Sequence, residues 1–99
     1  MHARVSILEG PPDKIDDGLR QVREQVVPQA KQLDGFKGML ALGDRQSGKL
    51  LGITFWENEE AMRASEEAAN RMRSETAEAS EEEITGVERY EVGFFEVES

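Results

Sequence analysis

Hydrophobic and polar positions along the chain follow one plan twice: an alternating segment, a segment with helical spacing, and another alternating segment. The first cycle comprises residues 3–9, 13–33 and 37–42, and the second comprises residues 50–56, 58–79 and 87–97. Alternation predicts strands, and apolar residues three or four positions apart predict amphipathic helices. Because two helices cover only one face of a four-stranded sheet, the other face must meet solvent, a ligand or a second subunit.

Each predicted helix has one apolar stripe that is expected to pack on the sheet. In the first helix the stripe comprises Ile15, Leu19, Val22, Val26 and Leu33, and in the second it comprises Met62, Ser65, Ala69, Met72 and Thr76. Pro28 lies within the first helix and lacks a backbone N–H, so a kink or a new start is expected near Val27. The second stripe consists of small or flexible side chains, so the domain needs stabilisation from elsewhere.

Strand alternation assigns side chains to the two faces of the sheet. In the first strand Ala3, Val5 and Ile7 form the apolar set, which is expected to lie against the helices. The same logic assigns to the open face His2, Arg4, Ser6, Thr54, Trp56, Arg89, Glu91 and Phe95. An open face with two exposed aromatic side chains is expected to close against a second copy of the chain, and the void between the two sheets is the predicted pocket.

Composition excludes several classes of function. The chain has 12 Lys and Arg against 21 Asp and Glu, and a net charge of -9 disfavours nucleic acid and anionic membrane surfaces as partners. There is no Cys, which excludes disulfides, thiol nucleophiles and cysteine metal sites. No apolar run is long enough to span a membrane, and the N-terminus enters a strand without a signal-peptide pattern. These features predict a cytoplasmic protein.

The acidic residues between positions 57 and 83 are expected to form a solvated helix face. Several have an Arg partner four residues away, for example Glu59 with Arg63 and Glu67 with Arg71. Consecutive glutamates such as those at positions 81–83 do not converge on one ion without a specialised loop. No metal site is predicted.

Two motifs carry a family resemblance that extends over the whole chain. D-G-F-K-G at residues 34–38 enters the second strand, and W-E-N-E-E-A-M at residues 56–62 joins the third strand to the second helix. With these motifs the chain resembles the antibiotic-biosynthesis-monooxygenase-like proteins of the dimeric α/β-barrel superfamily. The resemblance implies one α+β domain over residues 1–99, with a ferredoxin-like split β-α-β topology and a four-stranded antiparallel sheet. Two such sheets would form a barrel in a homodimer.

Known members of this family differ in activity. Some oxygenate quinol-type aromatics without a cofactor, some degrade haem, and several have no established reaction, so the resemblance implies one of these three cases. Haem-degrading members carry an Asn, a Trp and a His that would align with Ala3, Ser65 and Glu75 of this chain. None of the three is present, which argues against haem degradation.

Cofactor-independent oxygenation asks for a dry cavity, an aromatic wall and groups that deprotonate or bind a phenolic hydroxyl. His2 is the candidate base, with Arg4 and Arg89 as catalytic residues that hold the developing anion. The candidate ligand-binding residues are Ser6, Thr54, Trp56, Glu91 and Phe95. His2, the two arginines and Trp56 also have structural interpretations. His2 would be a surface residue near the terminus, Arg4 and Arg89 would pair with Glu91 across the sheet, and Trp56 would pack in the dimer.

Two hypotheses of different classes stay open at this point. The first is a small-molecule monooxygenase that acts on an aromatic or quinol-type compound in the barrel without metal or prosthetic group. The second is a non-catalytic dimeric barrel with a ligand-binding or structural role. A catalyst needs its polar side chains to line a void, whereas a packing protein fills that void with side chains such as Trp56 and Phe95.

Overall fold

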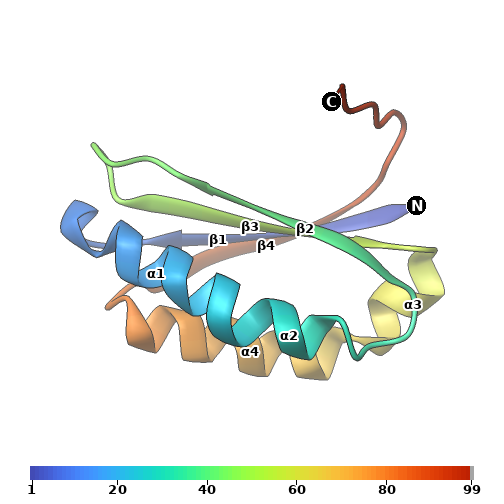
Figure 1. Cartoon of the computed structure of the whole chain (residues 1–99), viewed down its shortest axis with the longest axis horizontal. Coiled ribbons are helices and arrows are strands. Elements are labelled where there is room, and N and C mark those ends of the chain that lie inside the picture. The colour runs from blue at the N-terminus through green and yellow to red at the C-terminus, as the bar shows by residue number, and fades with distance from the viewer. Residues whose placement is uncertain (99) are drawn as a thin grey trace.

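The computed structural model describes residues 1–98. Its elements in chain order are β1 (His2–Glu9), the 3-10 turn η1 (Pro12–Lys14), α1 (Ile15–Gln21), the π-helical segment η2 (Val22–Val26), α2 (Val27–Ala30), β2 (Phe36–Gly43), β3 (Lys49–Trp56), α3 (Glu59–Ala64), α4 (Glu66–Ala79) and β4 (Glu83–Glu91). The strands form one antiparallel sheet in the order β2-β3-β1-β4. The predicted split β-α-β topology is confirmed, and the helices lie together on one face of the sheet (Figure 1).

The long first helix changes its winding before Pro28. Residues Val22–Val26 are π-helical, and α2 begins at Val27 with Pro28 in its first turn. A proline at that position has no N–H to donate to the Glu24 carbonyl, and the wider π turn accommodates the missing bond. The predicted new start near Val27 is confirmed.

The second predicted helix stripe is buried throughout, and the first is buried at three of its five positions, with Leu19 and Leu33 partly buried. Every member of the second stripe is less than one-tenth exposed, and Ile15, Val22 and Val26 of the first stripe are equally buried. The core has two clusters, one around Leu8, Ile15 and Leu50 and another around Val22, Val26 and Met72. The spacing of apolar residues was therefore sufficient to orient both helices.

The fourth strand lies earlier in the chain than the predicted residues 87–97. It runs from Glu83 to Glu91, and residues 92–98 have no regular secondary structure. The reason is the length of its partner: β1 pairs His2 with Glu91, and only Val92 N–H to the Met1 carbonyl (2.9 Å) follows. Beyond this point the chain has no strand beside it, and it leaves the sheet on the side opposite to the helices (Figure 1).

The predicted assignment of the two sheet faces is wrong. Arg4 Nη2 donates to the Met62 carbonyl of α3 at 2.6 Å, and Arg73 Nε of α4 donates to Ser6 Oγ at 2.9 Å. Residues that pair across antiparallel strands share a face. The helix side therefore carries His2, Arg4, Ser6, Thr54, Trp56, Arg89 and Glu91. Only Phe95, whose ring lies 5.2 Å from that of Phe55, is on the open side as predicted.

The open face is the more apolar of the two. It presents Ala3, Val5, Ile7, Leu40, Leu42, Leu51, Ile53, Phe55 and Tyr90. Leu40, Leu42 and Tyr90 are 46%, 45% and 53% exposed, and Phe94 in the tail is 82% exposed. The prediction assumed that the helices cover the apolar set of strand residues. In the structure the helices cover the face that carries the polar set, and the apolar set lies on the uncovered face.

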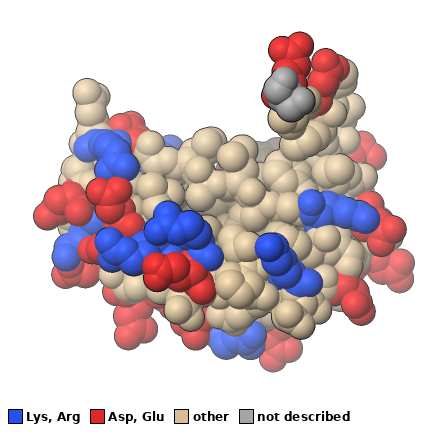
Figure 2. Space-filling view, in the orientation of Figure 1, with Lys and Arg blue, Asp and Glu red and all other residues tan. Residues whose placement is uncertain are grey.

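Charged side chains are distributed unevenly over the surface. Figure 2 shows them gathered over the helices and at the ends of the molecule, with largely uncharged surface across the middle. Among residues 1–98, no helix is long and apolar enough to cross a membrane. Within the same range no three His, Asp or Glu side chains come together as a group that could hold a metal ion.

The connection from α4 to β4 buries an acidic side chain. Ser80 is fully buried, donates from Oγ to the Thr76 carbonyl at 2.7 Å and contacts Glu82 Oε1. Glu82 is 9% exposed, and its Oε2 has no hydrogen-bond partner within the described residues. Burial raises the pKa of Glu82, because a carboxylate is costly away from water.

Replacing Glu82 with Gln should raise the free energy of unfolding at pH 7 by roughly 1 kcal/mol. The amide keeps the shape of the side chain, donates to Ser80 Oγ and removes a buried charge. A raised pKa means that wild type gains stability as the pH falls toward the pKa of Glu82, so the difference between the two proteins should shrink there. Urea denaturation tests this, with Glu83→Gln at the exposed neighbour as control. A less stable Glu82→Gln protein would contradict it.

Candidate functional site

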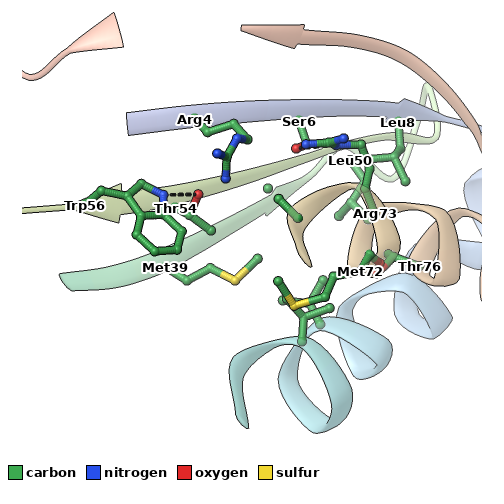
Figure 3. A pocket seen from close by; sticks show the side chains of 14 residues that line it. Arg4, Ser6, Leu8, Met39, Leu50, Thr54, Trp56, Met72, Arg73 and Thr76 are labelled. Atoms are coloured by element: carbon green, nitrogen blue, oxygen red, sulfur yellow. Dashed lines mark hydrogen bonds between the residues drawn. The ribbon is translucent and has the colours of Figure 1, made fainter. Parts of the chain in front are cut away.

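A cavity of about 60 Å³ lies between the sheet and the helices. Its apolar wall includes Leu8, Val22, Val26, Met39, Leu50 and Met72, and its polar groups come from Arg4, Ser6, Thr54, Arg73 and Thr76. Figure 3 shows Arg4 and Ser6 entering from β1, Arg73 rising from α4, and Met39 and Met72 on the opposite side. This cavity lies within one chain, whereas the predicted pocket lies between the sheets of two chains and stays a prediction.

Trp56 forms the aromatic end of the cavity and is held from three directions. Its indole N–H donates to Thr54 Oγ1 at 2.9 Å (Figure 3). The Phe36 ring packs edge-on at 5.5 Å, and the Arg4 guanidinium lies 5.7 Å from the centre of the indole ring. Only 1% of Trp56 is exposed. Its ring is thus a rigid, preorganised wall.

Arg4 is the most deeply buried charged side chain of the site, with 2% of its surface exposed. Its Nη2 donates to the Met62 carbonyl, to Ser65 Oγ at 3.0 Å and to Glu66 Oε2 at 2.7 Å. These bonds tie β1 to the junction between α3 and α4. The other edge of the guanidinium, Nε and Nη1, has no partner within residues 1–98.

Glu66 joins Arg4 to Arg89 on the fourth strand. Arg89 donates from Nε and Nη2 to the two carboxylate oxygens of Glu66 at 2.9 and 2.6 Å. Hydrogen bonds from Arg89, opposed by partial burial and aided by those from Arg4, lower the pKa of Glu66 to about 2. Arg89 is partly exposed and does not line the cavity. It holds Glu66, and through Glu66 it positions Arg4.

Arg73 is a second buried arginine, with 9% of its surface exposed. Its Nε bonds Ser6 Oγ, and its Nη1 donates to Asn70 Oδ1 at 2.7 Å. Its Nη2 is without a partner in the described part of the chain, where no carboxylate forms a salt bridge with it. Burial and the nearby Arg4 lower the pKa of Arg73, while Glu66 acts in the opposite direction.

Gly52 lies on the sheet floor of the cavity, opposite Ser6 on β1. A Cβ built there would meet the Met39 methyl carbon at 3.6 Å, which is ordinary van der Waals contact. A small side chain at this position would therefore begin to fill the cavity without a clash at its Cβ. The glycine keeps the space open.

Four of the eight predicted site residues line this cavity: Arg4, Ser6, Thr54 and Trp56. Arg89 and Glu91 lie beside them on the same face but outside the lining, and Phe95 is on the other face. His2 pairs with Trp56 at the end of the sheet and does not line the cavity either. The candidate base therefore lies on the same face as Arg4 but outside the cavity.

Sequence analysis missed Arg73, Met39 and Gly52. A signal for Arg73 was present, because it lies four residues after Ala69 and three before Thr76, both in the buried stripe. A charged residue at such a position has to find polar partners on the sheet. Ser6 provides one of them.

The chain resembles longer curated proteins of Mycobacterium tuberculosis. It is 39% identical over 77 residues to the uncharacterised protein Rv2558, covering 78% of this chain and 33% of that protein. It is 37% identical over 78 residues to Rv2557, covering 79% and 35%. The chain therefore spans about a third of the length of the curated relatives it matches. No family model matches it.

Solved structures share the fold over nearly the whole chain. A Deinococcus radiodurans protein assigned as an antibiotic biosynthesis monooxygenase superposes with a TM-score of 0.70 at 20% identity, covering 100% of this chain and 99% of its own. The monooxygenase ActVA-Orf6 of Streptomyces coelicolor, solved with nanaomycin D, gives 0.64 at 17% identity, covering 98% and 91%. A dimeric ferredoxin-like protein from an uncultured marine organism gives 0.60 at 7% identity, covering 98% and 93%. The chain therefore has the ferredoxin-like α+β fold of the antibiotic-biosynthesis-monooxygenase-like proteins, as its sequence motifs predict.

Proposed function

We propose that this domain binds a small phenolic or quinol-type aromatic compound in the cavity between sheet and helices, and oxygenates it without metal or prosthetic group. The observation that carries the proposal is the pair of buried arginines beside a fixed Trp56 ring in a largely apolar cavity. The indole offers a surface for an aromatic ring, and the free guanidinium N–H groups offer bonds to a phenolate oxygen. The shared fold with the monooxygenases supports the reaction class.

The arrangement favours a reaction in which the substrate supplies the electrons. An ordinary phenol has a pKa of about 10, and adjacent guanidinium groups favour its phenolate. For 4-ethylphenol as a model, the benzylic methylene para to the phenolate oxygen becomes a carbonyl. One oxygen atom of O2 forms that carbonyl, and the other leaves as water with the two methylene hydrogens. The methylene carbon loses the four electrons that O2 gains.

Ligand entry requires movement of methionine side chains. At about 60 Å³ the cavity holds roughly four to six water molecules, which is less than an aromatic ring with a substituent needs. Met39 and Met72 line the side opposite the arginines, and their unbranched side chains repack readily. The proposal therefore favours single-ring compounds over large polycyclic ones.

A non-catalytic binding role is the second candidate, and a specific observation favours it. The two arginines are the only ionisable side chains that line the cavity in the described structure, so no His, Asp, Glu, Lys or Tyr is in place to move a proton. The oxygenase proposal depends on a substrate that ionises beside the arginines. Oxygen consumption separates the two candidates.

We also propose that two copies associate through their open faces. Exposed Leu40, Leu42 and Tyr90 on that face form an apolar surface that a second copy would cover. The C-terminal tail rises from the same side with Phe95 packed on Phe55. A ferredoxin-like structural neighbour is itself dimeric, which supports the proposal.

Filling the cavity tests the binding proposal directly. Gly52→Val adds a branched side chain that suits a strand and enters the cavity. Trp56 is the only Trp of the chain, so its fluorescence reports on the cavity wall. We expect 4-ethylphenol to quench the wild-type protein saturably and Gly52→Val at least about tenfold more weakly, a difference of roughly 1.4 kcal/mol.

The matched control is Gly38→Val, on the opposite face of the same sheet. It should bind like wild type. Equal binding by Gly52→Val and wild type would place the ligand elsewhere, and no saturable quenching of wild type would overturn the proposal. In the oxygenase case, an oxygen electrode records one O2 for each 4-hydroxyacetophenone formed. Binding without oxygen uptake would leave the non-catalytic role as the better account.

A further inference from the structure

Arg73 stands out among the charged side chains of the cavity because it has no anionic partner within residues 1–98. Arg4 and Arg89 both have Glu66, whereas the bonds of Arg73 go to the neutral groups of Ser6 and Asn70. A buried guanidinium without a counter-ion costs free energy, and proteins keep such groups buried only where something compensates. Its Nη2 has no partner within residues 1–98 and belongs to a side chain that lines the cavity.

The surroundings of Arg73 add to the surplus of positive charge. Arg4 contributes a second guanidinium to the same cavity, and Glu66 is the one carboxylate bonded to the Arg4 and Arg89 groups. Arg4 Nε and Nη1 are free within the described residues, so Arg4 retains donors after Glu66 is bound. A chain with a net charge of -9 thus encloses a positively charged cavity.

The free Nη2 of Arg73 and the uncompensated charge of its guanidinium match the acceptor pattern of a carboxylate. A carboxylate presents two oxygens with several lone pairs, and planar guanidinium groups bind them at well-defined angles. A neutral hydroxyl would satisfy one of the free N–H groups and leave the positive charge uncompensated. A carboxylate accepts a bond from the free N–H group and also compensates the positive charge.

We propose that Arg73 is the anion subsite of the cavity, and that the ligand is a small aromatic acid whose carboxylate binds Arg73, while the free edge of Arg4 beside Trp56 remains for the phenolic oxygen. This inference rests on the proposed function, because it specifies the ligand of the same cavity. The ring of the acid lies toward Trp56, and the carboxylate lies toward α4. Arg73 is then the residue that selects acids over their neutral analogues.

The test compares an acid with its neutral isostere: 4-hydroxyphenylacetate and 4-hydroxyphenylacetamide. They share the ring, the phenol and the methylene, and differ in charge. Titration followed by Trp56 fluorescence gives both affinities. In wild type we expect the acid to bind roughly tenfold or more tightly than the amide, and in Arg73→Met we expect the two to bind alike.

Arg71→Met is the matched control, because Arg71 lies exposed on the same helix and its loss changes the net charge equally. It should keep the acid preference. Arg73→Met should remain folded, since it replaces an uncompensated buried cation with an apolar side chain of similar length. Its unfolding temperature checks this, and Arg73→Lys, which keeps the charge, should recover part of the preference.

The outcomes separate this inference from the function on which it rests. If wild type binds the amide and 4-ethylphenol as tightly as the acid, the anion subsite is wrong and the aromatic cavity stands. If the acid preference persists in Arg73→Met, another group selects the acid and the assignment to Arg73 is overturned. If none of the three compounds binds, the proposed function fails, and the anion subsite fails with it.

Discussion

Replacing Arg4 with Met should lower the free energy of unfolding by roughly 1.5 to 3 kcal/mol, the range for losing hydrogen bonds that involve a charged group. The loss removes the guanidinium donor that the Met62 carbonyl, Ser65 Oγ and Glu66 Oε2 share. Glu66 keeps its two bonds from Arg89, and the Met62 carbonyl keeps its bond from Ser65 Oγ. It also removes the link between β1 and the α3–α4 junction. Urea denaturation followed by circular dichroism measures the effect.

The control for this change is Arg63→Met, which removes an exposed helix ion pair with Glu59 and should change stability little. The pH dependence gives a second test. The pKa of Glu66 falls from 4.5 to about 2 in the folded protein, so its stabilising contribution is present above pH 4.5 and is lost as the pH falls toward 2. Arg4→Met should show less of this loss. Equal stability of wild type and Arg4→Met would refute the account of the network.

Replacing Ile53 with Asp should convert a dimer into a monomer. Ile53 lies on β3 in the middle of the open face, between Val5 on β1 and Leu40 on β2. A carboxylate there would have to be buried without a partner between the two sheets. Light scattering should give wild type a mass near twice 11.1 kDa and the variant a mass near 11.1 kDa.

A change outside the open face serves as control for the dimer prediction. Gln46→Glu adds the same charge in the exposed turn between β2 and β3 and should leave the mass unchanged. A wild-type protein that is monomeric at micromolar concentration would remove the role proposed for the apolar face.

The elements and the orientation of the helices followed from local pattern alone. Helical spacing placed Met62, Ala69 and Met72 in the core, and Pro28 marked the change of winding near Val27. Both are properties of residues close together in sequence, where periodicity and backbone chemistry act directly. The end of β4 could not be predicted in this way, because it depends on a distant segment. The strand ends at Glu91, which pairs with His2, the first residue of β1.

The faces of the sheet could not be assigned from alternation. Alternation separates two sets of side chains but does not say which set the helices cover. Here the covered face carries Arg4 and Ser6, which form hydrogen bonds with Ser65, Glu66 and Arg73 on the helices. The apolar set of strand side chains therefore lies on the open face. Arg4, Ser6, Thr54 and Trp56 were nevertheless grouped correctly, because positions two apart on a strand share a face.

The most direct test of the cavity uses the methyl groups of the four methionines, labelled with 13C and observed by NMR during titration with 4-ethylphenol. Met39 and Met72 line the cavity, whereas Met1 is exposed at the end of the sheet. We predict saturable shifts for Met39 and Met72, with ligand-to-methyl NOEs, and no change for Met1. Shifts confined to Met1, or no shift at any methionine, would contradict a binding site between the sheet and the helices.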